Sequence, residues 1–331
     1  MQKQLPSDAQ RHPGLDALRV FLILAVVLGH VLEISPPFQG RELLYRTVYC
    51  FHMGAFLFLF GYFAKFSPQR ILRGYLLPYL LFQFLYILFL RHVLHTTRQM
   101  QFTTPYWILW YLLACAFYQL LIPFFGVGSW KTHLAYLVGA VLLSLAVGLD
   151  NTVGYYATVS RFFVYLPWFL LGYYARRYGG QLRPWVKGHR DFLLVLSVLM
   201  IICSLFYLRM DKFQSDALFG SYPYSKKDYG PIQRLLFLVM GLGWTGFLLI
   251  LFSRRRRSIP LLTGLGQNTL SVFLLHGFVI KAIPKRVPWL MSLPLVTLWL
   301  TALLLLLFGN PLIGKLFRIL FTPAPRQKQT P

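Results

Sequence analysis

One apolar stretch near the N-terminus carries ionisable residues at a spacing that places them on one helical face. It reads GLDALRVFLILAVVLGHVLEI, with Arg19 near its start and His30 and Glu33 near its end. At about 100° per residue, Arg19 and His30 lie within about 20° of each other, separated by about 16 Å along a helix. Because ionisable residues inside a membrane span are costly and usually face a cavity, this stripe is the strongest functional signal.

Each residue of this stripe also has a purely structural explanation. Arg19 could extend its guanidinium to the lipid headgroups, and Glu33 could be an interfacial residue. His30 could be a neutral histidine that is hydrogen-bonded within a helix bundle. A histidine is also the side chain best suited to general acid–base or nucleophilic chemistry near neutral pH.

Two more histidines occur in apolar stretches further along the chain. His52 lies in YRTVYCFHMGAFLFLFGYFAK and His276 in LLTGLGQNTLSVFLLHGFVIK, at depths that match His30 if each stretch crosses the membrane once. Three histidines could bind a metal ion, but Glu33 is the only carboxylate available to support such ligands, so no metal site is expected. The three cysteines all fall in apolar stretches, form no CxxC motif and are expected to be buried thiols.

A pair of arginines follows the second apolar stretch in the segment KFSPQRILRGYLLPYL. If the next helix begins near Pro68, Arg70 and Arg73 are neighbours on one face of its first turns. Two guanidiniums at a helix N-terminus suit a phosphate group. The same residues could instead serve only as a topology signal.

The amino-acid composition indicates that the histidines, Glu33 and the arginines named above are positioned by transmembrane helices. Hydrophobic residues make up 57% of the 331 residues and charged residues only 13%, whereas soluble domains carry about 25% charged residues. Apolar runs of about 18–22 residues without period-2 alternation indicate an all-α bundle of about ten transmembrane helices. The expected spans are residues 15–34, 45–64, 72–90, 106–126, 134–149, 161–175, 192–208, 232–252, 262–283 and 289–309. We expect one membrane domain over 1–322 and a short basic tail over 323–331.

The net charge is +24, and the distribution of the basic residues along the chain indicates the topology of this bundle. Lys and Arg concentrate in alternate connections, which the positive-inside rule assigns to the cytoplasm together with both termini. Membrane lipids, and not nucleic acid, are therefore the expected partners of the basic loops, including Arg254–Arg257. The segment 209–231 falls outside and is rich in aromatic and hydroxyl residues, which suits either a sugar-binding surface or an ordinary solvated loop.

Taken together, these stretches resemble the acyltransferase 3 family of membrane O-acyltransferases, and in particular its branch named for fucose 4-O-acetylase. GLDALRVFLILAVVLGH resembles the family's first helix, FHMGAFLFLFGYFAK and RILRGYLLPYLLFQF its second and third, and TPYWILWYLLACAFYQLLIP the branch's Trp-rich fourth helix. SRFFVYLPWFLLGYYARR and GQNTLSVFLLHG resemble later blocks. Gly54 departs from the branch, which usually has Pro after FHM.

The resemblance implies a reaction and a role for each site residue. The family transfers acyl groups, commonly acetyl from acetyl-CoA, to hydroxyls of extracytoplasmic or lipid-linked glycans, and no bound cofactor is expected. Arg19, Arg70 and Arg73 would bind the acyl-CoA donor. His30 would act as general base or acyl carrier, oriented by Glu33. Further residues would face the cavity or the acceptor, namely His52, Arg161 and His276. A multi-pass protein of the plasma membrane is expected.

Two other classes of protein also fit the sequence. A transporter or flippase for an anionic glycan or lipid would use a basic mouth and intramembrane histidines, although no inverted repeat is visible. A non-catalytic partner in polysaccharide export is the third possibility.

Overall fold

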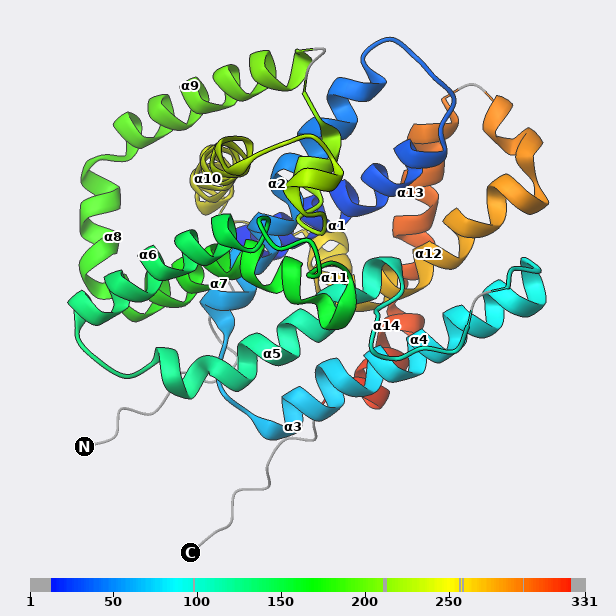
Figure 1. Cartoon of the computed structure of the whole chain (residues 1–331), viewed down its shortest axis with the longest axis horizontal. Coiled ribbons are helices and arrows are strands. Elements are labelled where there is room, and N and C mark those ends of the chain that lie inside the picture. Colours follow the sequence, from blue (N-terminus) through cyan, green and yellow to red (C-terminus); the bar gives the residue numbers. More distant parts are fainter. Residues whose placement is uncertain are drawn as a thin grey trace, which may run out of the picture.

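The computed structural model describes residues 13–97, 99–210, 213–255, 257, 259–293 and 295–322. Within these ranges every regular element is helical, so the predicted all-α class is confirmed (Figure 1). The elements are α1 Pro13–Ile34, α2 Arg41–Phe63, α3 Pro68–Arg70, η2 Ile71–Leu76, α4 Leu77–Leu88, η3 Phe89–Val93, η4 Trp107–Leu109, α5 Trp110–Phe125, α6 Trp130–Ala146, η5 Tyr156–Thr158, α7 Val159–Arg177, α8 Gly179–Gly188, α9 Arg190–Arg209, η6 Ser215–Leu218, η7 Tyr224–Lys226, α10 Pro231–Ser253, α11 Pro260–Gln267, α12 Thr269–Arg286, η8 Pro288–Ser292, α13 Val296–Phe308 and α14 Pro311–Phe321.

Six helical segments of the described chain are long and apolar enough to cross a membrane. They are α1, α2, the continuous run Pro68–Val93, the run Trp107–Phe125, α9 and α10. A seventh span results if α13 and α14, which meet at a bend of 56°, count as one. The polytopic helix bundle is thus confirmed, while the count of ten spans stays a prediction.

The C-terminal third departs from the predicted spans because Asn268 interrupts it. The expected span 262–283 divides at this residue into α11 and α12. The Asn268 side chain donates to the carbonyl of Gly309 at 2.9 Å and accepts from Arg318 at 2.5 Å, which ties the break to the α13–α14 bend. Such an interruption is tolerated at membrane depth because the polar groups find partners inside the protein.

Three further elements differ from the sequence-based expectation. The expected span 289–309 is η8 followed by α13, and the helix α14 beyond it was not predicted. Helix α8, Gly179–Gly188, lies in the basic connection after the expected span 161–175, where no helix was predicted. Cys203 is exposed on α9, whereas Cys50 and Cys115 are buried as expected. The expected tail 323–331 lies outside the described residues.

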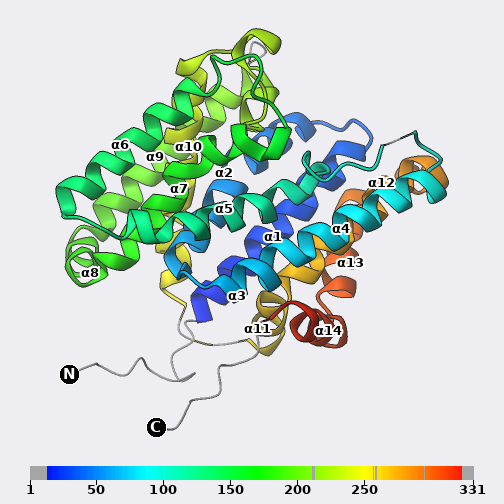
Figure 2. The ribbon, with the colours of Figure 1, turned by 60° about the horizontal axis from the view of Figure 1, so that its bottom comes forward.

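Helix α1 occupies the interior of the bundle, which places its ionisable residues among other helices (Figures 1 and 2). It packs against α2, α10, α11, α12 and α13. Its apolar side chains are buried on nearly every side, as expected for a central helix. Helix α11 also contacts α14, so the start of α1 and the end of the described chain lie near one end of the bundle.

Glycines let α7 pack closely against α2, which itself packs on this central helix. A Cβ on Gly61 would lie 2.1 Å from the Phe169 carbonyl oxygen, and one on Gly172 would lie 1.9 Å from the Phe58 carbonyl oxygen. Small residues at such contacts allow membrane helices to approach backbone to backbone. The contact fixes α2, which carries Tyr49 and His52, against α7, which carries Arg161.

Candidate active site

His30 and Glu33 form a hydrogen-bonded pair in the last turns of α1. The distance from His30 Nδ1 to Glu33 Oε1 is 3.0 Å, as the i, i+3 spacing allows. Tyr49 of α2 donates its hydroxyl to the same carboxylate oxygen and lies 3.1 Å from His30 Nδ1. Because a carboxylate accepts hydrogen bonds, this arrangement favours the tautomer that carries its proton on Nδ1.

The opposite nitrogen of the His30 ring is left without a hydrogen-bond partner among the described residues. The ring is largely buried, with its centroid 4.4 Å from the Trp107 ring and 5.4 Å from the His276 ring. With Nδ1 protonated, Nε2 carries a lone pair that can accept a proton or attack a carbonyl carbon. The arrangement is therefore chemically competent for either role.

The structure brings His30, His52 and His276 into one region, as their predicted depths indicated. His276 stacks on His30, and the His52 ring lies 5.0 Å from the Tyr49 ring. His52 and His276 each donate Nδ1–H to a backbone carbonyl one turn earlier, at 2.7 Å to Val48 for His52 and 2.9 Å to Val272 for His276. A carbonyl only accepts, so both carry the Nδ1 proton. No group of three potential ligands in the described chain could hold a metal ion.

Tyr49, Trp107 and Lys281 complete this cluster, and sequence reasoning missed all three. Lys281 Nζ lies 3.8 Å from the centroid of the Trp107 ring, in cation–π contact. Lys281 was detectable as an ionisable residue inside a predicted span. Tyr49 and Trp107 had no comparable signal, because aromatic residues are frequent in membrane helices.

Arg161 lies on the side of the cluster formed by the segment after α9. Its Nε donates to the carbonyl of Phe219 at 3.0 Å, and its guanidinium lies over the rings of Trp110 and Tyr155 at 5.0 and 5.2 Å. The Phe219 ring is 5.3 Å from that of Tyr49. Arg161 is therefore linked to the His30 cluster through Phe219, and no direct contact joins it to His30.

The three predicted donor-binding arginines lie toward the other end of α1. Arg19 pairs with Asp16 at 3.2 Å and lies over Phe63, the last residue of α2, at 4.8 Å. Arg70 and Arg73 follow that helix after a short loop and are exposed. The helix begins at Pro68 as predicted, with the Ser67 hydroxyl accepting from the Arg70 amide at 3.4 Å.

These features define a class, namely polytopic helical membrane proteins with a buried cluster of polar and ionisable side chains inside the bundle. The family model for the acyltransferase domain of the acyltransferase 3 family matches residues 12–315, nearly the whole chain. The chain therefore belongs to this family and is a membrane acyltransferase. A comparison with curated proteins gives no significant match, and neither does a comparison with solved structures.

Proposed function

We propose that this protein is an O-acetyltransferase of the plasma membrane, of the fucose 4-O-acetylase-like branch. In this proposal it moves an acetyl group from cytoplasmic acetyl-CoA to a hydroxyl of an extracytoplasmic cell-surface or lipid-linked glycan. The observation that carries the proposal is the His30–Glu33 pair, in which Nδ1 is held by the carboxylate and Nε2 is unpaired among the described residues.

The pair can perform the transfer with His30 as general base. Nε2 takes the proton of the acceptor hydroxyl while the oxygen attacks the thioester carbonyl of acetyl-CoA. The C–S bond then breaks, and the coenzyme A thiolate leaves with the proton that His30 holds. Glu33 stabilises the transient imidazolium, as the acid does in a catalytic triad. Tyr49 holds the Glu33 carboxylate toward His30.

A two-step route uses the same residues. Nε2 attacks the thioester first, so that an acetyl-imidazole forms and the C–S bond breaks. The oxygen of the acceptor hydroxyl then attacks the acetyl carbon, the bond between that carbon and Nε2 breaks, and the hydroxyl proton ends on the coenzyme A thiolate, which leaves as the thiol. Both routes need a neutral His30 whose ring is held through Nδ1.

In this proposal the donor enters at the cationic end of α1. Arg70 and Arg73 would pair with phosphates of acetyl-CoA, which suits their exposure, and Arg19 would lie further along the entry path. Arg19 and His30 are about 16 Å apart along α1, a distance that the long thioester-bearing arm of coenzyme A can bridge. Arg161 would contact the acceptor glycan on the outer side of the site, with His52 and His276 lying beside His30.

A transfer assay separates this proposal from a transporter or flippase. Purified protein in liposomes receives acetyl-CoA labelled in the acetyl group, together with cell-envelope glycan, and ester-linked label on the glycan is measured. We expect ester formation that depends on the protein. Movement of an anionic glycan or lipid across the liposome membrane without ester formation would favour the transporter.

A further inference from the structure

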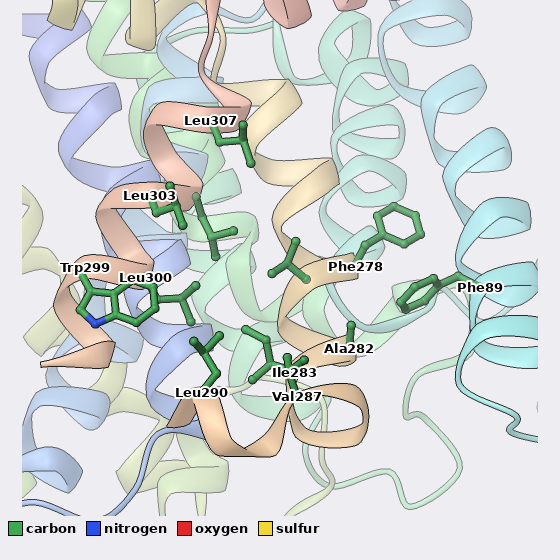
Figure 3. A pocket seen from close by; sticks show the side chains of 12 residues that line it. Phe89, Phe278, Ala282, Ile283, Val287, Leu290, Trp299, Leu300, Leu303 and Leu307 are labelled. Carbon is green, nitrogen blue, oxygen red and sulfur yellow. The ribbon is translucent and has the colours of Figure 1, made fainter. Parts of the chain in front are cut away.

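An apolar groove runs between α12 and α13 on the outside of the bundle (Figure 3). Its volume is about 500 Å³, within the range of about 300–1,000 Å³ that is typical of ligand pockets. Twelve hydrophobic residues line it, among them Phe278, Ala282 and Val287, and no polar side chain does. Leu303 and Leu307 expose 50% of their surface, so the groove is accessible from the surrounding hydrocarbon.

Basic residues lie at the end of the groove that is formed by the C-terminus of α12. Lys285 and Arg286 precede the lining residue Val287, and Arg91 follows the lining residue Phe89. Lys285 and Arg286 donate to the carbonyls of Leu94 and Val93, which brings the two cationic segments together. The sequence has no Asp or Glu between residues 43 and 149 or after 228. Among the described residues, none of the ion pairs to a carboxylate involves Arg91, Lys285 or Arg286.

Helix α12 connects this groove to the His30 cluster. Viewed down the axis of α12, the Lys281 side chain is rotated about 60° from Phe278, which faces the groove. It is rotated about 140° from His276, which faces the His30 cluster. The Phe278 ring stacks on that of Tyr86 at 4.0 Å, and Tyr86 lies against Gly277. Lys281 itself contacts Trp107, which lies against His30. Lys285, at the end of the groove, follows Lys281 by about one helical turn, so the charged end of a molecule in the groove would lie about one turn from the residue that contacts the His30 cluster.

We propose that this groove binds the hydrocarbon chain of a phosphate-linked lipid that carries the acceptor glycan. The chain fills the apolar groove, because hydrocarbon is the chemistry that its lining accepts. The phosphate lies at Arg91 and Lys285, and the attached sugar extends past Lys281 toward His30. This inference rests on the proposed function, since it specifies how the acceptor of that reaction is presented.

Binding to the groove can be measured without any transfer reaction. Native mass spectrometry or isothermal titration of the full chain is carried out with geranylgeranyl phosphate, geranylgeraniol and inorganic phosphate. We expect the lipid phosphate to bind at least about tenfold more tightly than either part alone, because charge-assisted contacts add to burial of the chain. Equal affinity for geranylgeraniol and its phosphate would reduce the groove to an ordinary lipid-covered surface and overturn the proposal.

Two pairs of variants localise the binding. Ala282→Trp fills the groove, and Ala302→Trp adds the same bulk at an exposed position of α13 outside it. The double change of Arg91→Gln and Lys285→Gln removes the charge, with the distant exposed change Lys131→Gln as its control. The first member of each pair should weaken binding of geranylgeranyl phosphate about tenfold or more, and the control should not. If Ala282→Trp left the affinity for geranylgeranyl phosphate unchanged, the groove would not be the binding site and the proposal would be overturned.

An activity comparison then connects the groove to the reaction. Wild-type protein and Ala282→Trp are supplied with acceptor glycan that is either lipid-phosphate-linked or released from its lipid. We expect Ala282→Trp to raise KM for the linked acceptor and to leave transfer to the released glycan unchanged. Equal KM values for the linked acceptor would contradict this inference alone, whereas no ester on either acceptor with wild-type protein would contradict the proposed function.

Discussion

Glu33 follows His30 by one helical turn on α1, and its Oε1 lies 3.0 Å from His30 Nδ1. This geometry assigns the ring one proton position and one free lone pair, which is what a general base or a nucleophile requires. The bundle supports the pair from three other elements, through Tyr49 of α2, Trp107 of η4 and His276 of α12.

Replacing Glu33 by Gln tests the orienting role of the carboxylate. The amide keeps the size of the side chain but cannot stabilise the imidazolium. We expect kcat for acetyl transfer to fall roughly 10²- to 10⁴-fold, with little change in acetyl-CoA affinity. Glu42→Gln is the matched control, because Glu42 is an exposed carboxylate paired with Arg46 on α2. Similar kcat values for the two variants would remove Glu33 from the chemistry.

Gly277 tests the packing of α12 against Tyr86 and against Trp107, the ring that lies beside His30. A Cβ at this position would lie 2.1 Å from the Tyr86 hydroxyl and 2.9 Å from the Trp107 ring. Gly277→Ala should cost roughly 1–3 kcal/mol of stability by overpacking and should reduce transfer. Thermal unfolding in detergent and the transfer assay measure both effects. Gly139→Ala, a helical site with open space around it, should show neither, and equal behaviour of the two variants would contradict the packing account.

Substitutions at Arg70 and Arg73 test whether these arginines bind the phosphates of acetyl-CoA. Arg70→Ala or Arg73→Ala should weaken acetyl-CoA binding by about 10- to 150-fold, the loss expected for a charge-assisted hydrogen bond. Lysine at either position should restore binding only in part, because it cannot form the bidentate contact. Direct titration with acetyl-CoA measures the effect, with the exposed Arg257→Ala as control. Unchanged affinity in both alanine variants would place the donor phosphates elsewhere.

Labelling of single cysteines tests the orientation. In a background without the three native cysteines, Ser225→Cys in η7 and Gln181→Cys in α8 are both exposed positions. An impermeant maleimide applied to intact cells should label position 225 and not position 181. The reverse pattern would invert the membrane orientation and exchange the donor and acceptor sides.

The features that depend on the geometry of a single helix could be predicted from the sequence. The 100° periodicity places Arg19, His30 and Glu33 on α1, and the helix with Arg70 was expected to begin near Pro68. Both expectations match the structure. The all-α class followed from apolar run length, because lipid permits few alternatives.

Features that depend on contacts between helices could not be predicted in this way. The division at Asn268 is stabilised by Gly309 and Arg318, which are distant in the sequence. Likewise, Tyr49 acquires its role only because α2 packs beside the end of α1. Lys281 was visible as a charge in a span, but its position against Trp107 depends on how α12 meets η4.

The transfer assay on His30→Gln tests the central claim most directly. Glutamine can replace a hydrogen bond of the imidazole but cannot take up a proton near neutral pH or carry an acetyl group. If His30 is the base or the acyl carrier, His30→Gln abolishes glycan O-acetylation, while the protein stays monodisperse and still binds acetyl-CoA. His189→Gln, at an exposed position after α8, keeps full activity. Substantial acetylation by His30→Gln at normal expression would contradict the account and direct attention to His52 and His276.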